Sequence, residues 1–279
     1  MSITVGLLHP GEMGGVVGRV ARAAGARVLW TSAGRSGASR ARAAGAGLED
    51  AGALADVVRA SDVILSVCPP HGALDVARAV AAERFTGLFV DANAVSPETT
   101  REIGRIVEKG GARFVDGGIV GPPPETPGTT RLYLSGAAAA EVARLFAGTA
   151  LEPVVVEGGP GAASAVKAAY AAWNKGWMAL VMAVRALARA EGVEPTLLAE
   201  WERSQPGLVA RSQAAAAGSA RKAWRWIGEM EEIAAAFAAD GLPDGFHLAA
   251  AEIYRRMERY RDAAEAPSIE EVARALAGK

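Results

Sequence analysis

The first thirty residues alternate between strand and helix patterns around a glycine-containing turn. The apolar run Ile3 to Leu8 predicts a buried strand, His9 to Gly14 predicts a turn, Gly15 to Ala24 predicts a helix, and Arg27 to Trp30 predicts a second strand. A helix N-terminus whose backbone amides can be approached closely binds the pyrophosphate of a dinucleotide. The pattern therefore predicts the first βαβ unit of a Rossmann-type domain.

The turn matches the G-x-G-x-x-G fingerprint only in part. His9 stands at the first glycine position, and Gly11 and Gly14 stand at the second and third. We interpret His9 as a turn residue that tolerates unusual backbone angles rather than as a catalytic group. The alternative is a glycine-rich turn in an ordinary α/β domain, but the flanking strand and helix favour a cofactor site. The residues expected to contact the cofactor here are His9, Pro10, Gly11, Glu12, Met13 and Gly14.

The residues after the second strand indicate which nicotinamide cofactor binds. A site for NAD carries Asp or Glu about 20 residues past the glycines, whereas a site for NADP carries Arg. Here Thr31, Ser32 and Arg35 follow the strand, and the first acid is Glu49. Hydroxyls and a guanidinium suit a 2′-phosphate, so the sequence predicts NADP. The alternative is a solvated polar loop.

Composition excludes several classes of function. The 279 residues carry 30 Lys and Arg against 31 Asp and Glu, so a net charge of −1 gives no electrostatic footprint for nucleic acid or an anionic membrane. Cys68 is the sole cysteine, and the chain has no charged-then-apolar leader, which together favour a cytoplasmic location. No apolar run reaches the length of a membrane span, and the three histidines show no metal-ligand spacing.

The chain divides by pattern into two predicted domains. Residues 1–160 alternate strands and helices, as a doubly wound parallel sheet requires, and residues 161–279 read as helical throughout. We therefore expect an α/β Rossmann-type NADP-binding domain followed by an all-α domain for substrate binding and dimerisation. The later strands are predicted at Val63 to Val67, Gly87 to Asp91, Arg113 to Asp116, Arg131 to Leu134 and Pro153 to Glu157.

The first helix of the second half is the longest. It is predicted from Ala162 to about Gly192, about 45 Å at about 1.5 Å per residue. Near its start Ser164, Lys167, Tyr170 and Asn174 are spaced so that they share one stripe of its surface.

Two residues of this helical half are candidates for proton transfer. A lysine buried in a cleft can have its pKa lowered and act as a general base, although a snorkelling surface lysine is the alternative reading of Lys167. His247 is a candidate proton donor, with a hydrogen-bonded structural histidine as the alternative.

Four stretches in order resemble the β-hydroxyacid dehydrogenases. That group contains 3-hydroxyisobutyrate and 6-phosphogluconate dehydrogenases, and the likeness is to the phosphogluconate-dehydrogenase-like branch with an uncharacterised helical C-terminal domain. The stretches are Pro10-Gly11-Glu12-Met13-Gly14, Asp91-Ala92-Asn93-Ala94-Val95-Ser96-Pro97, Asp116-Gly117-Gly118 followed by Gly128-Thr129, and Gly161 to Lys167.

The resemblance implies a role for several residues. Cys68 and Pro69 would lie along the nicotinamide ribose, and Asn93 and Ser96 would contact the nicotinamide and the substrate. Lys167 falls where the family keeps its catalytic lysine, which accepts the hydroxyl proton while hydride passes to the nicotinamide.

The chain also departs from the family pattern. The family often grips the substrate carboxylate with Ser-Gly-Gly, but Val120-Gly121-Pro122-Pro123-Pro124 stands in its place, and proline has no amide to donate. Gly121 is the residue of this loop expected to bind substrate. The family has an asparagine four residues after the lysine, where this chain has Ala171. That difference leaves Tyr170 or Asn174 to orient the substrate.

The sequence thus predicts an NADP-dependent oxidoreductase acting on a small β-hydroxyacid or its keto counterpart. An imine reductase is the nearest alternative enzyme, although it usually has Asp or Tyr where this chain has Lys167. A non-catalytic NADP-sensing protein is the alternative from another class. A homodimer through the helical half is also expected, because that half carries many large apolar side chains: Trp173, Trp177, Trp201, Trp224 and Trp226.

Overall fold

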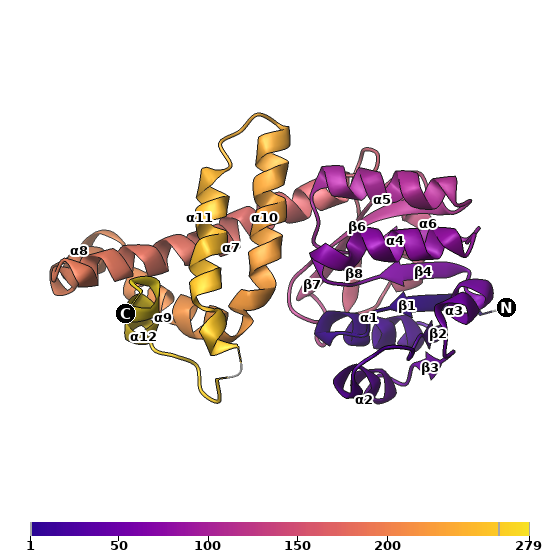
Figure 1. Ribbon diagram of the computed structural model, residues 1–279, viewed down its shortest axis with the longest axis horizontal. Helices are drawn as coiled ribbons and strands as arrows, with labels where there is room; N and C mark the ends of the chain where they lie inside the picture. Colours follow the sequence, from indigo (N-terminus) through magenta and orange to yellow (C-terminus); the bar gives the residue numbers. More distant parts are fainter. Residues whose placement is uncertain (1, 262, 279) are drawn as a thin grey trace. The chain divides into compact units, whose positions relative to one another are not determined.

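The computed structural model describes residues 2–261 and 263–278. The chain divides into two compact units, Met1–Ala168 and Ala169–Lys279 (Figure 1). The predicted domain ranges, 1–160 and 161–279, place the boundary eight residues earlier and include residues 1, 262 and 279, which lie outside the described residues. The boundary differs because the first two turns of the long helix pack against the sheet of the first unit.

The first unit is built on one eight-stranded sheet in the order β3-β2-β1-β4-β5-β6-β7-β8. Strands β1 to β6 are parallel, which confirms the Rossmann-type fold. The strands are β1 Thr4–Leu8, β2 Arg27–Trp30, β3 Glu49–Asp50, β4 Val63–Ser66, β5 Leu88–Asp91, β6 Arg113–Val120, β7 Thr130–Ser135 and β8 Leu151–Val155.

Three expectations about this sheet were wrong in detail. Strand β7 runs antiparallel to β6, because the loop of residues 121–129 is too short for the crossover that a parallel neighbour needs. Strand β3 was not predicted, since its two residues are both charged and exposed. Strand β8 begins at Leu151 rather than Pro153.

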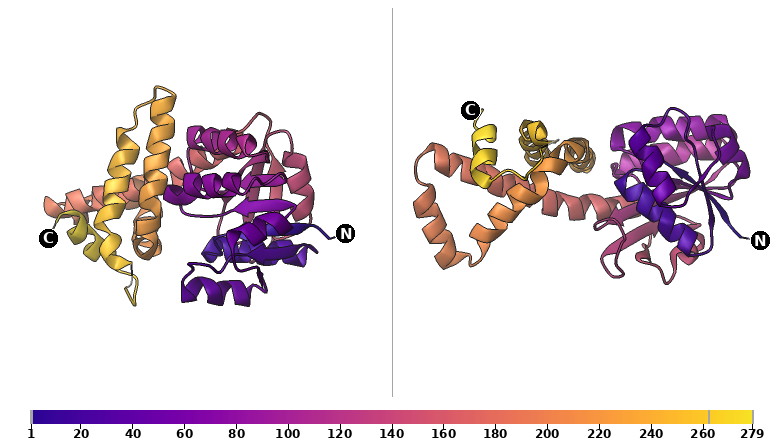
Figure 2. Two further views of the ribbon diagram at one scale, coloured as in Figure 1. Left: turned by 45° about the vertical axis from the view of Figure 1, so that its right-hand side comes forward. Right: turned by 90° about the horizontal axis from the view of Figure 1, so that it is seen from below.

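Six helices cover the two faces of the sheet (Figure 2). Helices α1, α2 and α6 pack with Val5, Leu7 and other strand residues in one apolar cluster, and α3, α4 and α5 pack with Leu8, Ile64 and others in a second cluster. Because both faces are buried, the strands read as continuous apolar runs. The helices are α1 Glu12–Ala23, α2 Gly37–Gly45, α3 Leu54–Ala60, α4 Ala73–Ala82, α5 Pro97–Lys109 and α6 Ala139–Phe146. Pro70–Gly72 forms a short 3₁₀ helix.

The second unit is helical, as predicted. Helix α7 begins in the first unit and continues into the second, and α10 and α11 lie side by side (Figures 1 and 2). The helices are α7 Ala162–Ala190, α8 Glu194–Ser204, α9 Leu208–Ser219, α10 Ala223–Ala239, α11 Gly245–Arg256 and α12 Ile269–Leu276, with 3₁₀ helices at Ala220–Lys222 and Glu258–Tyr260. No helix within the described residues is long and apolar enough to cross a membrane.

A buried arginine holds several of these helices together. Arg185 of α7 is 1% exposed, and it donates to Glu194 Oε1 at 2.8 Å and to Ser212 Oγ at 2.8 Å. Arg189 donates to the other oxygen of Glu194 at 2.7 Å. The three helices α7, α8 and α9 are therefore joined by one charged network, which satisfies the buried guanidinium.

Candidate cofactor and proton-transfer site

The glycine turn after β1 has the shape that a bound phosphate requires. Helix α1 begins at Glu12 rather than at the predicted Gly15, with Gly11 as its N-cap and no side chain capping it. A Cβ on Gly14 would lie 2.4 Å from the carbonyl oxygen of His9, so only glycine fits there. No atom lies within 4 Å of a Cβ built on Gly11, so the helix N-terminus can be approached.

His9 stands at the first glycine position with a backbone angle that favours glycine. Its φ of 70° lies in the left-handed region, which agrees with the interpretation of a residue tolerant of unusual angles. Burial and the charge of Arg35 lower the pKa of His9 to about 4. The imidazole is therefore neutral at physiological pH.

Arg35 comes from the loop between β2 and α2 and lies close enough to His9 to affect its charge. Burial lowers the pKa of Arg35. Arg35 Nε and His9 Nδ1 are buried atoms without a well-formed hydrogen bond among the described residues, although the backbone of Leu8 interacts with the His9 imidazole and raises its pKa. Orphaned buried nitrogens of this kind fit a site that receives an anion.

Two other residues of the predicted cofactor site are bound within the protein. Thr31 donates to the carbonyl oxygen of Gly52 at 2.7 Å and is 6% exposed. The Ser32 side chain bonds to Asp50 of β3, which lowers the pKa of that carboxyl. Pairing of β3 with β2 thus brings an acid to the end of β2 that the sequence reasoning missed, because a two-residue charged strand carries no apolar signal.

Helix α2 is hydrogen-bonded to both the β2–α2 loop and the glycine turn. Arg40 donates to the carbonyl oxygens of Ser32 at 3.0 Å and Arg35 at 3.4 Å, and its charge contributes to lowering the pKa of Asp50. Arg42 donates to the carbonyl oxygen of Pro10 at 3.2 Å. These two arginines therefore tie the β2–α2 loop and the glycine turn to one helix.

Asn93 joins the carboxyl ends of β4 and β5. It is 2% exposed, accepts from the Cys68 amide at 2.6 Å, and donates to Ser66 Oγ at 3.0 Å and to Asp91 Oδ1. Burial and Asp91 raise the pKa of the Cys68 thiol to about 12, so this thiol stays protonated. Asn93 thus shapes the strand ends where dinucleotides bind in such folds, and its predicted contact with a ligand stays a prediction.

The neighbouring predicted residues lie on the same edge of the sheet. Ser96 is the N-cap of α5 and accepts from the Thr99 amide at 3.1 Å, and Pro69 precedes the 3₁₀ helix after β4. Met13 packs partly buried against the first apolar cluster. The carboxyl ends of β1, β4 and β5 therefore carry these predicted residues together.

Strand β6 and the start of α7 hold Lys167 in place. The Lys167 ammonium donates to the carbonyl oxygen of Ile119 at 2.8 Å. A Cβ on Gly118 would lie 2.8 Å from the carbonyl oxygen of Ala163 and 3.0 Å from Lys167 Cβ, so glycine permits the close approach of the helix. Lys167 is half-buried and fixed against the sheet.

A buried carboxylate anchors the first turn of α7. Asp116 is fully buried and accepts hydrogen bonds from the Gly161 amide at 2.9 Å, the Ser164 amide at 3.1 Å, Ser135 Oγ at 2.9 Å and Ser164 Oγ at 2.6 Å. A carboxylate at a helix N-terminus satisfies amides that lack partners and complements the helix dipole. The sequence predicted Asp116 only as part of a family motif. Its role as the anchor of α7 was not predicted, because the hydrogen bonds join β6 to α7 and leave no local sequence pattern.

The loop after β6 is stiff and poor in donors. Gly121 has a φ of 125°, and a Cβ there would lie 2.4 Å from the carbonyl oxygen of Thr129. Thr130 donates to the carbonyl oxygen of Pro122 at 2.5 Å, and Glu125 pairs with Arg19 of α1 at 2.6 Å. The prolines offer no amide hydrogen, so this loop differs chemically from an amide cradle for a carboxylate.

The remaining candidates lie in the second unit. Tyr170 is 53% exposed, and Asn174 donates to the carbonyl oxygen of Tyr170 at 3.2 Å. His247 is 4% exposed between the rings of Phe237 and Phe246, and burial lowers its pKa. The stripe from Ser164 to Asn174 crosses the unit boundary, so the common orientation of these side chains stays a prediction.

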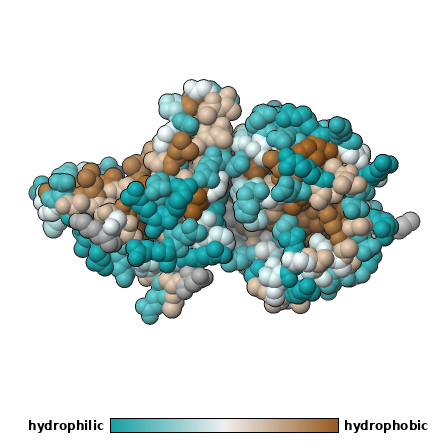
Figure 3. Space-filling view, viewed as in Figure 1, coloured by the Kyte–Doolittle hydropathy of each residue, from teal (hydrophilic) through white to brown (hydrophobic). Residues whose placement is uncertain are grey.

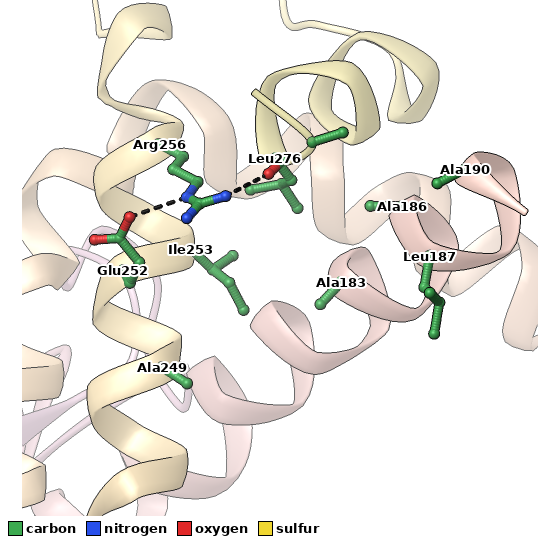
Figure 4. Close-up of a pocket in the computed structure, with 10 residues that line it drawn as sticks. Ala183, Ala186, Leu187, Ala190, Ala249, Glu252, Ile253, Arg256 and Leu276 are labelled. Carbon is green, nitrogen blue, oxygen red and sulfur yellow. Dashed lines mark hydrogen bonds and ion pairs between the residues drawn. The ribbon is translucent and has the colours of Figure 1, made fainter. Parts of the chain in front are cut away.

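A pocket of about 370 Å³ lies within the second unit, between α7, α11 and α12 (Figure 4). Small apolar residues such as Ala183 and Ala249 line it, and Glu252 and Arg256 bond to each other at its wall. None of the predicted site residues lines this pocket. The described residues also contain no group of three His, Cys, Asp or Glu side chains that could hold a metal ion.

Comparison with known proteins agrees with this architecture. Residues 188–257 match the family model described as Domain of unknown function (DUF1932). An uncharacterised 28.5 kDa protein from Methanothermus fervidus is 38% identical over 66 residues, which span 24% of this chain and 25% of that protein.

Solved structures share the fold over nearly the whole chain. The conserved protein MTH1747 of unknown function, described as structurally similar to 3-hydroxyacid dehydrogenases, is 26% identical, with a TM-score of 0.68 and coverage of 94% of this chain and 100% of that chain. The 3-hydroxyisobutyrate dehydrogenase of Mycobacterium tuberculosis is 18% identical, with a TM-score of 0.69 and coverage of 100% and 99%. A reductive aminase from Aspergillus terreus, solved in complex with NADPH and ethyl levulinate, is 20% identical with a TM-score of 0.55 and coverage of 98% of each chain.

These matches confirm the resemblance inferred from the motifs at the level of the fold. Residues 188–257 thus match the DUF1932 model, and the chain as a whole shares the fold of structures related to the 3-hydroxyacid dehydrogenases.

Proposed function

We propose that the protein is an NADP-dependent oxidoreductase that transfers a hydride between the nicotinamide and a small β-hydroxyacid or its keto counterpart. Lys167 is the general acid or base. The observation that carries this proposal is the placement of Lys167, which the Asp116 network and the carbonyl oxygen of Ile119 hold on the sheet that also bears the glycine turn.

The chemistry of Lys167 follows from its surroundings. An ammonium has three hydrogens, so it can hold a substrate oxygen and still donate to Ile119. The bound nicotinamide would supply or accept the hydride, and Lys167 would give or take the proton on the substrate oxygen. The half-buried position excludes part of the solvent from that proton transfer.

Substitution of Lys167 tests this role. Lys167→Met removes the amine and keeps most of the side-chain bulk, so kcat should fall by about 10²–10⁴ while the dissociation constant for NADPH stays unchanged. Lys109→Met, on the exposed end of α5, is the matched control. A Lys167→Met protein that turns over at the native rate would refute the assignment.

The preference for NADP rests on Arg35. Arg35 is half-buried, its buried Nε has no hydrogen-bond partner among the described residues, and Asp50 is engaged by Ser32 and Arg40. We expect NADPH to bind more tightly than NADH. Arg35→Ala should weaken NADPH binding by about 1.5–3 kcal/mol and leave NADH binding unchanged, with Arg59→Ala, at an exposed side chain of α3, as the control. Equal dissociation constants for the two cofactors in the native protein would contradict this preference.

Two alternatives have specific support. The likeness to a reductive aminase fold and the donor-poor loop at Pro122 to Pro124 favour an imine reductase that needs no carboxylate grip. The shortage of amide donors in this loop also favours a non-catalytic NADP-sensing protein. Oxidation of NADPH in the presence of a panel of keto acids and imines separates the three functions. Turnover of keto acids alone indicates the dehydrogenase, turnover of imines alone indicates the imine reductase, and no turnover indicates the NADP-sensing protein.

We also propose a homodimer formed through the helical part, acting on a small molecule in the cytoplasm. Trp173, Leu180 and Leu187 recur every seven residues along α7 and are 69%, 47% and 64% exposed. Hydrophobic residues, coloured brown, reach the surface of the helical part in Figure 3. Such a stripe suits an obligate interface. A monomeric mass by light scattering at micromolar concentration would contradict the dimer.

A further inference from the structure

His9 occupies a position in the glycine turn that normally carries no side chain. Its φ of 70° is the conformation that a glycine would adopt, and its carbonyl oxygen accepts from the Gly11 amide at 2.7 Å. The imidazole is therefore an added group at the turn that precedes the N-terminus of α1, where such folds bind a dinucleotide.

The nitrogens around this turn are incompletely paired. His9 Nδ1 and Arg35 Nε, from two different loops of the first unit, are buried atoms without a well-formed hydrogen bond among the described residues, although the backbone of Leu8 interacts with the imidazole and raises its pKa. Buried polar atoms without a well-formed hydrogen bond are rare in folded proteins. An anion with several acceptor oxygens would satisfy both nitrogens together.

The charged and titratable groups around His9 come from every element packed near the turn. Arg35 lies on the β2–α2 loop, Arg42 of α2 reaches the Pro10 carbonyl, Glu12 opens α1, and the Cys68 thiol follows β4. The cations favour an anionic ligand, and the thiol stays neutral because burial and Asp91 raise its pKa to about 12.

We propose that His9 is a phosphate-recognition residue, which together with Arg35 contacts a phosphate group of the bound dinucleotide and takes up a proton when the dinucleotide binds. This inference rests on the proposed function in one respect only, that the ligand is a nicotinamide dinucleotide.

The direction of proton linkage follows from electrostatics. In the free protein the Arg35 charge and burial disfavour imidazolium and hold the pKa of His9 near 4. A phosphate next to both groups reverses the sign of the local field and raises the pKa of His9. Between the two pKa values the complex holds more protons than its separate components, so affinity rises as the pH falls.

The number of protons taken up follows if the pKa of His9 returns to its ordinary value of about 6.5 in the complex. At pH 6 the complex would then hold about 0.75 of a proton more on His9 than the free protein. The affinity at pH 6 would exceed that at pH 8 by about fourfold through His9 alone.

Calorimetric titration with NADP⁺ measures this proton directly. Titrations at pH 6 and pH 8, each in two buffers of different ionisation enthalpy, yield the number of protons taken up. The native protein is compared with His9→Gly, which suits the positive φ, and with His9→Asn, which also tolerates it. The 2′-phosphate of the ligand also titrates at about pH 6, so the difference between the native protein and the His9 variants measures the proton that His9 and the phosphate hold jointly. His71→Asn, an exposed histidine of the same unit, is the control.

We expect the native protein and His71→Asn to take up about 0.75 of a proton more at pH 6 than both His9 variants, and all four to agree at pH 8. Equal proton uptake by the native protein and the His9 variants, with NADP⁺ bound in each, would overturn the role of His9 and leave the proposed cofactor in place. No binding of NADP⁺ to the folded native protein would overturn both. With NAD⁺ the uptake should vanish, because Arg35 is assigned to the 2′-phosphate, and uptake that persists would overturn the contact of His9 and Arg35 with one phosphate.

Discussion

Replacement of Asp116 by asparagine tests how the fold places Lys167. Three of the four hydrogen bonds to Asp116 end on Oδ2, from the Gly161 amide, the Ser164 amide and Ser135 Oγ. Asp116→Asn can keep these bonds by turning its remaining oxygen toward them. Its amino group then faces Ser164 Oγ, which can accept as well as donate.

The expected loss is the difference between charged and neutral acceptors. Hydrogen bonds to a charged group contribute about 1.5–3 kcal/mol and neutral ones about 0.5–1.5 kcal/mol, so three bonds lose about 3 kcal/mol. Loss of the interaction with the N-terminus of α7 adds about 0.3–1 kcal/mol, and easier burial of a neutral amide offsets part of the total. We expect a net destabilisation of about 2–4 kcal/mol.

Hydrogen exchange locates that loss. The amides of Gly161 and Ser164 should exchange at least about 30-fold faster in Asp116→Asn, since about 1.4 kcal/mol corresponds to tenfold. Asp56→Asn is the matched control, because Asp56 lies exposed in the first turn of α3 and pairs only with Arg59 in the described structure. Exchange at Gly161 and Ser164 that is equal in the two variants would refute this account of the anchor.

Other perturbations have equally direct outcomes. Gly121→Ala places a Cβ 2.4 Å from a carbonyl oxygen at a φ of 125°, so the melting temperature should fall, and an unchanged value would contradict the strain. Arg185→Met leaves Glu194 without one buried partner and should lower the free energy of unfolding in urea by about 3–5 kcal/mol, whereas exposed Arg203→Met should not. The lowered pKa of His9 means that the unfolded state takes up a proton first as the pH falls from about 6.5 to 4. Stability should therefore decline over that range by about 1–2 kcal/mol after allowance for solvent screening, and a decline equally steep in His9→Gly would contradict this source.

Much of the fold could be predicted because its signals are local. A strand buried on both faces must be apolar along its length, and a turn before a dinucleotide-binding helix needs glycine where a Cβ would strike the backbone, as at Gly14. The two-unit organisation followed from the disappearance of strand patterns after Gly161.

Contacts between distant segments were not predictable in this way. Strand β3 was missed because its pairing with β2, and not its own composition, makes it a strand, and that pairing brings Asp50 to Ser32. The antiparallel direction of β7 depends on the length of a loop. Neither property is encoded in the apolar periodicity of a single segment.

The sequence by itself determined the glycine turn, the order of the strands along the chain, the helical second half and the identity of Lys167 as a candidate, because each depends on residues close together in the chain. Only the tertiary structure decided which groups surround them. It showed that Asp116 anchors the helix bearing Lys167, that Asn93 is held by Cys68, Ser66 and Asp91, and that His9 and Arg35 share one charged environment. Burial, hydrogen bonding and electrostatic coupling between separate loops exist only once the chain has folded.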